Sequence, residues 1–490
     1  MAVRRRSART ATTLLAFAVF AAACGGGDGA DGGGDGETAA GDLPECPVEA
    51  LEEYDASDGP IEVLLWHSQI AEPLASLETL TEEYNSSQDK VHVTLQSQGT
   101  SYEEVERQFE RAIPTSDLPA VVVFDDTITQ FMSDSGVIIP AQSCIDADGY
   151  DNSGWLPLAV DFYSIDDVMY PATVGLASAL IYYNRGHFEE AGLDPDDPPE
   201  TLEEVREYAE AIQAAGVTET PLAFNMTPFI LEFWLTGAGA PIVDNNNGRD
   251  ARAEASAFDN ERTHEIFEWI DGMIEDGLIS PFSGTPGQIN HYLSMANEQS
   301  SMVIESDTAS TSVTAFLAGN LEVDELGEDL PEAPDVSGLD IGAGALPGLE
   351  APGLGQVGGA TYYITNTTPP EVQAGAWDFL KFLNEKDSQV QFYLQGSYHP
   401  VEPATTEDEA VQEFWSSDKA GEWLKISYDS LVGIDTDFPG PLIGPYTEVR
   451  DIIRDALDRL AFERATPDEV IAEADASITE AIERYNEENF

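Results

Sequence analysis

The chain has 490 residues, of which 42% are hydrophobic and 23% charged, so it is long enough for two or three globular domains. Its 92 acidic residues outnumber 21 basic ones, for a formal net charge of −71, which excludes a general nucleic-acid binder and argues against electrostatic binding to anionic lipid. Six histidines and three cysteines are too few for a cysteine-rich zinc or redox protein.

Residues 1–23 have the pattern of an export signal. Arg4, Arg5, Arg6 and Arg9 precede the apolar run 11–23, which is too short to span a bilayer comfortably. The residues Ala21-Ala22-Ala23-Cys24 resemble a bacterial lipobox, which predicts a lipid on Cys24 and a place at the cell membrane, on its extracytoplasmic face. The alternative is a plain secretory signal with an incidental cysteine. Removal of 1–23 takes away four arginines and no acid, so −71 becomes −75.

Residues 24–58 are predicted to be a tether, because 25–41 is rich in Gly and Asp and has no apolar periodicity. Two cysteines remain after Cys24, namely Cys46 and Cys144. Outside the cytoplasm an even number of cysteines usually pairs, so we expect a disulfide that fixes the start of the folded part to a loop. Two separate thiols are the alternative.

Strands and helices alternate from residue 59 onward. Short apolar runs predict strands over 61–66, 91–95 and 120–124. A helix is expected over 72–84 from its apolar face, and another begins at Ser101 with a capping box. This order predicts an α/β fold with a largely parallel sheet and helices on both faces.

Two further capping boxes predict helices later in the chain. One joins Thr201 to Glu204, and the other joins Thr466 to Glu469 near the end. Residues 331–359 are rich in Gly and Pro and are expected to form an irregular connection.

Catalytic and metal-binding motifs are not found in the sequence. The acidic run with Asp146, Asp148 and Asp151 lacks the Gly and Glu that a calcium loop of the EF-hand type requires, which favours a solvated loop. With 92 acids present, no chosen pair of carboxylates indicates a glycoside hydrolase. We therefore expect no catalytic residue, no metal and no cofactor.

Several segments between residues 60 and 487 resemble one family. Taken with the export signal, they are similar to the solute-binding components of bacterial ABC importers, of the carbohydrate type called extracellular solute-binding protein family 1, and within that type to its glycerol-3-phosphate binders. The segments are LWHS at 65–68, LIYYN at 180–184, AGLDP at 191–195, PPET at 198–201, GGA at 358–360, WDFLKFL at 377–383 and GSYHP at 396–400.

The resemblance implies a two-lobed, periplasmic-binding-protein-like α/β fold of type II, with three crossings between lobes and a ligand cleft. The first lobe would comprise 59–171 and 360–402, and the second 172–359 and 405–490. It also implies a non-enzymatic protein, a monomer, that captures a polyol, sugar or glycerol-phosphate-type solute and delivers it to the permease subunits of an ABC importer.

The resemblance further implies a set of ligand contacts. Arg450 matches a phosphate-binding arginine, and a guanidinium suits phosphate bidentately, although it could also be a helix-surface arginine paired with an acid. Asp126 follows the third predicted strand, where a carboxylate accepts hydroxyl hydrogen bonds or caps a helix. The full implied set is Tyr102, Asp126, Ser178, Ser306, Asp307, Gly359, Tyr398 and Arg450.

Three functions stay open at this point. The first is the solute-binding protein, either with a phosphate preference or as a general binder of mono- and oligosaccharides. The second is a secreted glycoside hydrolase, which would need two carboxylates facing one sugar bond. The third is a surface adhesion or scaffold protein, which no sequence repeat supports.

Overall fold

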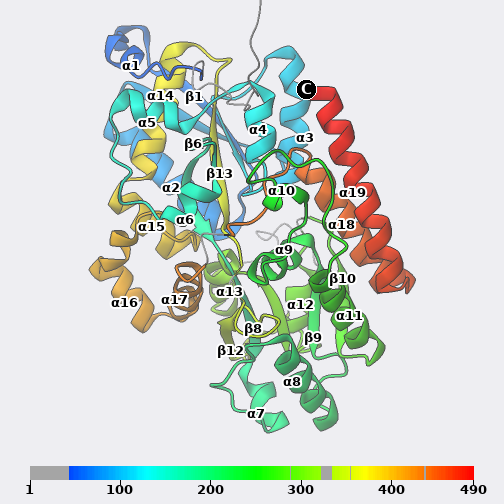
Figure 1. Cartoon of the computed structure of the whole chain (residues 1–490). Coiled ribbons are helices and arrows are strands. Elements are labelled where there is room, and N and C mark those ends of the chain that lie inside the picture. Colours follow the sequence, from blue (N-terminus) through cyan, green and yellow to red (C-terminus); the bar gives the residue numbers. More distant parts are fainter. Residues whose placement is uncertain (1–42, 287, 322–333, 354, 435–437) are drawn as a thin grey trace, which may run out of the picture. The chain divides into compact units, whose positions relative to one another are not determined.

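The computed structural model describes residues 43–286, 288–321, 334–353, 355–434 and 438–490 (Figure 1). The predicted export signal, Cys24 and the glycine-rich run 25–41 lie outside the described residues. Two sheets, each covered by helices, organise residues 43–490. They are the cores of the two lobes that the resemblance implies. The residue ranges predicted for the lobes stay a prediction.

The first sheet has the strand order β2-β1-β3-β13-β4, and β7 also pairs with β13. Strands β1, β2 and β3 are parallel, as predicted, whereas β13 runs antiparallel to β3, β4 and β7. The bounds are β1 Ile61–His67, β2 Val91–Ser97, β3 Val121–Phe124, β4 Ile138–Ile139, β7 Ala172–Ala177 and β13 Gly358–Thr365.

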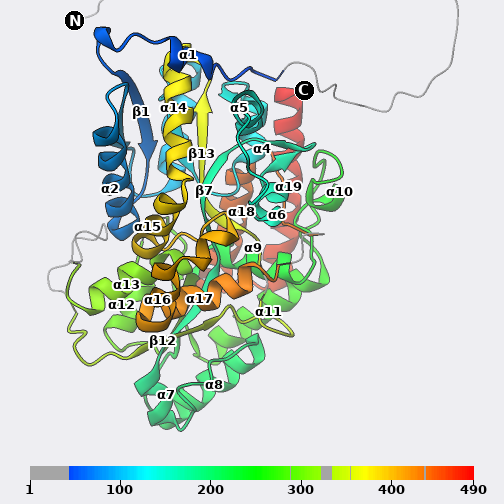
Figure 2. The ribbon, with the colours of Figure 1, turned by 90° about the vertical axis from the view of Figure 1, so that its left-hand side faces the viewer.

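Helices cover both faces of the first sheet, as the alternation of strands and helices predicted. Helices α2 (Ala71–Ser87) and α14 (Pro370–Leu383) share a core with Val121 and Val123 (Figure 2). Helix α3 (Tyr102–Ala112) packs on Val122 and Phe124, whose side chains point to the other face because side chains alternate along a strand. The Ser101 side chain accepts the Glu104 N–H at the start of α3.

The second sheet has the order β10-β9-β11-β8-β12 and is also mixed. Strands β9, β10 and β11 are parallel, and β8 is antiparallel to both β11 and β12. The bounds are β8 Ala179–Asn184, β9 Leu222–Met226, β10 Ile279–Ser283, β11 Met302–Ser306 and β12 Ile341–Ala345.

Strand β12 lies inside the stretch 331–359 that the sequence predicted to be irregular, so that prediction was wrong for these residues. The strand has the sequence IGAGA, and its glycines allow close approach of neighbouring side chains. A Cβ on Gly342 would lie 2.7 Å from the Tyr183 ring, and one on Gly344 would lie 2.6 Å from Pro198. Glycine here marks tight packing rather than a turn.

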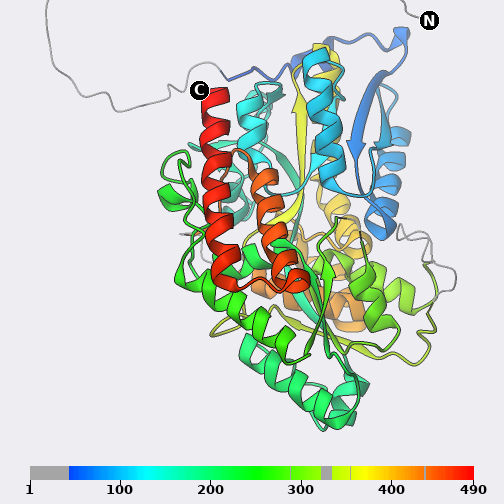
Figure 3. The ribbon, with the colours of Figure 1, turned by 90° about the vertical axis from the view of Figure 1, so that its right-hand side faces the viewer.

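Helices of the second lobe lie on both faces of its sheet. Helices α8, α9, α11, α18 and α19 share one core with Phe224 and Ile304, and α12 and α17 pack on the face of Tyr182 and Val303. Figure 3 shows α19 beside α18. The capping boxes of Thr201 and Thr466 are both present. The bounds are α8 Leu202–Ala215, α9 Pro228–Gly237, α11 Glu261–Glu275, α12 Asn290–Ala296, α13 Ser310–Leu317, α17 Lys419–Leu431, α18 Tyr446–Asp458 and α19 Pro467–Asn489.

The remaining elements are short or peripheral. Their bounds are α1 Glu49–Glu53, α4 Thr129–Ser135, α5 Ala141–Asp148, α6 Pro157–Phe162, β5 Ser164–Ile165, β6 Val168–Met169, α7 Arg185–Ala191, α10 Asp244–Asn247, α15 Lys386–Gly396 and α16 Glu409–Ser417. Among the helices that the structure describes, none has the length and apolar character needed to cross a membrane.

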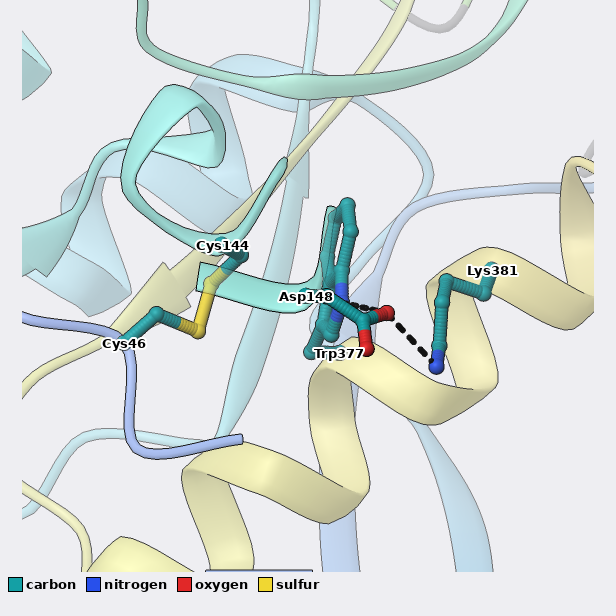
Figure 4. The surroundings of a disulfide bond; sticks show 5 residues. All are labelled: Cys46, Cys144, Asp148, Trp377 and Lys381. Atoms are coloured by element: carbon teal, nitrogen blue, oxygen red, sulfur yellow. Dashed lines mark hydrogen bonds and ion pairs between the residues drawn. A yellow bond between two sulfur atoms is a disulfide. The ribbon is translucent and has the colours of Figure 1, made fainter. Parts of the chain in front are cut away.

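The expected disulfide is present between Cys46 and Cys144, and both residues are buried (Figure 4). It joins the segment before α1 to helix α5, so the prediction that it joins this segment to a loop was wrong. One turn after Cys144, the Asp148 carboxylate accepts the Trp377 indole N–H at 3.0 Å and lies 2.8 Å from Lys381 Nζ. Asp146 and Asp148 therefore lie in helix α5 rather than in the solvated loop that the sequence predicted, and Asp148 is held by these two partners on α14.

Candidate functional site

A cavity of about 380 Å³ lies between the two sheets, and elements of both lobes line it. Six of the eight predicted ligand contacts lie on its wall. They are Tyr102 at the start of α3, Asp126 after β3, Ser306 at the end of β11, Gly359 in β13, Tyr398 after α15 and Arg450 in α18. Strands β3 and β11 both end at this cavity, the place where open α/β sheets bind ligands.

Two predicted tyrosines meet in one wall of the cavity. The hydroxyls of Tyr102 and Tyr398 are 3.2 Å apart. Gln69, after β1, donates its side-chain amide to the Tyr102 hydroxyl at 2.9 Å and accepts from the Tyr398 hydroxyl at 3.3 Å. Burial raises the pKa of both tyrosines, so both stay neutral and present hydroxyls that donate and accept.

Arg450 is held by carboxylates from both lobes. Its Nε and Nη2 donate to Glu232 on α9 at 2.9 and 2.6 Å, and its Nη1 donates to Asp125, after β3, at 2.5 Å. The Arg450 side chain is only 10% exposed, and that of Glu232 is fully buried. All three guanidinium nitrogens therefore already have an anionic partner.

Asp126 is a buried carboxyl group beside this cluster. Burial raises the pKa of Asp126 to about 8, opposed by Arg450 and reinforced by Asp125 and Glu232. Burial likewise raises the pKa of Glu232, against the opposite effect of Arg450. At neutral pH the Asp126 carboxyl thus retains a proton in much of the population, and it both donates to and accepts from a hydroxyl group.

Two predicted contacts, Asp307 and Ser178, are not on the cavity wall. Asp307 is fully buried, and its Oδ2 lies 2.7 Å from His399 Nε2. Ser178 is buried, and its carbonyl accepts the Asp307 N–H at 3.1 Å. Their neighbours Ser306 and Ala177 do line the cavity, so the predicted segments are in place with the side chains one residue off.

Several residues of the site were not predicted from the sequence. Arg454 and Asp125 line the cavity, whereas Glu232 and Gln69 lie outside its wall and bind residues that line it. Glu232 has a detectable signal, because it is the only charged residue in α9, whose sequence is PFILEFWLTG. Arg454 lines the cavity one helical turn after Arg450, and among the described residues no hydrogen-bond partner is found for its buried Nε. Nothing in the sequence near Asp125 or Gln69 indicated their roles, because their hydrogen-bond partners lie on elements that are distant in the sequence.

Comparison with known proteins agrees with this architecture. The family described as bacterial extracellular solute-binding protein matches residues 79–420, more than half of the chain. The chain belongs to that family.

Relatives of this solute-binding protein include two named as sn-glycerol-3-phosphate-binding periplasmic proteins, UgpB. The one from Rhizobium meliloti is 24% identical over 87% of this chain and 93% of its own length, and the one from Escherichia coli K12 is 21% identical over 86% and 91%. Among solved structures, UgpB from Mycobacterium tuberculosis in complex with glycerophosphocholine superposes with a TM-score of 0.70 at 18% identity, covering 87% of this chain and 99% of that one. The GacH receptor of Streptomyces glaucescens, solved unliganded and with acarbose, superposes with a TM-score of 0.68 at 17% identity. The match covers 86% of this chain and 98% of that one.

The structural matches establish the fold as that of two-lobed periplasmic binding proteins, and the family establishes the role. The chain is an extracytoplasmic solute-binding protein that acts in transport, in a family of binding proteins rather than enzymes.

Proposed function

We propose that this solute-binding protein captures an uncharged sugar or polyol in the cavity and delivers it to the permease of an ABC importer. The main support for this proposal is that the carboxylates of Glu232 and Asp125 already neutralise the charge of the Arg450 guanidinium. Four acids line the cavity, against two arginines. Even with Asp126 protonated, the other three acids outnumber the two arginines, so a phosphate would enter a site with an excess of negative charge, whereas hydroxyl groups would find carboxylate acceptors. The acids are Glu103, Asp125, Asp126 and Glu305.

In this proposal Asp126, Tyr102 and Tyr398 form hydrogen bonds to solute hydroxyls, and Ser306 adds one from the second lobe. Gly359 contributes by packing. It has φ +136°, and a Cβ there would collide with the Gly175 carbonyl on β7, so glycine brings β13 against β7 at the edge of the cavity.

A phosphorylated polyol or glycerophosphodiester is the second candidate. The relatives named above bind glycerol 3-phosphate or glycerophosphocholine according to their names. Arg454 forms ion pairs with Glu103 and Asp451, and its Nε has no hydrogen-bond partner among the residues that the structure describes. Such a solute would compete with Asp125 and Glu232 for Arg450, because these two carboxylates already accept from three of its five N–H donors.

Thermal unfolding with a panel of neutral sugars, polyols, glycerol 3-phosphate and glycerophosphocholine tests the proposal. Binding to the folded state raises Tm by an amount that grows with the logarithm of the ligand concentration divided by Kd. We expect stabilisation by at least one neutral compound, recovered unchanged by chromatography. Release of a hydrolysis product would instead support the glycoside hydrolase alternative, and stabilisation by phosphate esters alone would favour the second candidate.

We further propose that Cys24 carries a lipid that anchors a monomeric protein to the extracytoplasmic face of the membrane. In a host that processes lipoproteins, Cys24→Ser should move the protein from the membrane fraction to the soluble fraction. The Cys46→Ser/Cys144→Ser variant, which leaves Cys24 intact, should remain in the membrane fraction. Equal partitioning of Cys24→Ser and wild type would contradict the anchor.

A further inference from the structure

A second cavity, of about 300 Å³, adjoins the acid-lined one. The two share part of their walls, including Tyr102, Tyr292, Ser306 and Tyr398. The two cavities are therefore adjacent, and these four side chains, each with a hydroxyl group, belong to the wall that they share. This volume is many times the roughly 10–15 Å³ that a single water needs, so the cavity is large enough for a substantial substituent.

The second cavity differs from the first in its chemistry. None of the described residues on its wall is charged, although 23% of the whole chain is. Most of its apolar side chains come from helices α12 and α13, from strand β12 and from Leu339, which lies two positions before β12. The principal side chains are Leu293, Met295, Val313, Phe316, Leu339 and Ile341.

Three of these side chains are not buried by the protein itself. Val313, Phe316 and Leu339 are each half-buried, so each keeps apolar surface facing the cavity. Contact of that surface with water is unfavourable, and an apolar group that replaces the water gains the hydrophobic free energy. In a chain this acidic, an uncharged apolar chamber beside a binding cavity is a feature that a ligand would use.

We propose that the natural solute is amphiphilic, with a hydroxylated head group in the acid-lined cavity and an alkyl or aryl substituent in the second cavity. The head group rests on the function proposed above, and the substituent rests on the second cavity alone. The shared wall favours one occupant. Because the two cavities are adjacent, a single molecule can place its head group in one and its substituent in the other.

Paired glycosides test the proposal by calorimetric titration. For a sugar that binds, the hexyl or phenyl glycoside should have a Kd at least tenfold below that of the methyl glycoside, since each buried methylene is worth up to about fourfold. Phe316→Gln should remove most of this gain and leave the methyl glycoside unchanged. Phe462→Gln is the matched control, because Phe462 is 50% exposed and away from both cavities. Val313→Thr, nearly isosteric, serves if Phe316→Gln unfolds.

The apolar fluorophore N-phenyl-1-naphthylamine gives a readout that does not depend on the sugar. We expect wild type and Phe462→Gln to enhance its fluorescence and Phe316→Gln or Val313→Thr to do so several-fold less. If no sugar binds but this pattern holds, the proposed head group fails and the apolar subsite stands. Equal affinity for methyl and hexyl glycosides, together with fluorescence that is the same in all variants, would overturn it. So would a dimer in sedimentation that Phe316→Gln converts to a monomer, because a second copy would then be the occupant.

Discussion

Arg450 and Asp125 form an ion pair across the cavity, with Nη1 of Arg450 2.5 Å from Oδ2 of Asp125. Arg450 lies on α18 in the second lobe, and Asp125 follows β3 in the first. The aspartate carboxylate thereby occupies a donor that a phosphate oxygen would otherwise use. The pair links the two lobes and sets the charge of the site at the same time.

Asp125→Asn should change the preference of the site toward anions. The substitution removes one negative charge and weakens the hold on Arg450 Nη1, so we expect the affinity for glycerol 3-phosphate to rise about tenfold, or about 1.4 kcal/mol. Calorimetry measures this directly. The matched control is Asp134→Asn, because Asp134 also pairs with an arginine, Arg252, at 2.7 Å but lies outside both cavities. A similar gain in both variants would show a general effect of net charge.

We expect Arg450→Ala to lower the free energy of unfolding even when no ligand is present. It leaves the Glu232 carboxylate buried without its cation, which costs about 3–5 kcal/mol in comparable buried pairs. Urea unfolding measures the free energy, and Arg450→Ala/Glu232→Gln should recover part of the loss. If Arg450→Ala unfolds like wild type but no longer binds solute, Arg450 is a ligand contact and our account of the pair is wrong.

Glu106 makes stability depend on pH. This buried residue of α3 accepts the Thr447 hydroxyl at 2.6 Å, and burial raises the pKa of Glu106 to about 8. Because of this raised pKa, the folded state keeps a proton on Glu106 that the unfolded state releases near pH 4.5. The stabilisation of the folded state by this proton is therefore complete below pH 4.5 and is lost as pH rises through about 8. Glu106→Gln should therefore flatten the fall in Tm between pH 6 and 8.5. Glu104→Gln, on the same helix, is the control, and an unchanged slope in Glu106→Gln would contradict the assignment.

The disulfide should contribute strongly to stability. It closes a long loop, because Cys46 and Cys144 are 98 residues apart, and the chain-entropy estimate for such a loop is about 4–5 kcal/mol. Thermal unfolding with and without a reductant measures the effect, and the Cys46→Ser/Cys144→Ser variant should be insensitive to the reductant. Equal Tm for oxidised and reduced wild type would show that packing of the first lobe alone holds this segment.

The local elements could be predicted because their signals are local. The capping boxes at Thr201 and Thr466 and the apolar run at the first strand depend on residues within a few positions of one another. Strand β12 was missed because its signal is the fit of Gly342 against Tyr183, a residue 159 positions earlier, and glycine otherwise suggests a turn.

The residues that line the candidate cavity were predictable in part, but the charge of the cavity was not. The resemblance located Tyr102, Tyr398 and Arg450, and the structure brings them to one cavity. The resemblance could not indicate that Glu232 would neutralise Arg450. The two residues are 218 positions apart in the sequence, and their pairing depends on how α9 and α18 pack. The apolar chamber was unpredictable for the same reason, since α12, α13 and β12 contribute to it separately.

Calorimetric titration of the wild-type protein with a neutral sugar and with its phosphate ester, under the same buffer and salt, tests the central claim most directly. The account predicts that the neutral sugar binds at least tenfold more tightly than the ester, because the acids around Arg450 repel the phosphate. Tighter binding of the ester would contradict it and would mean that Arg450 and Arg454 form an anion site despite their acidic partners.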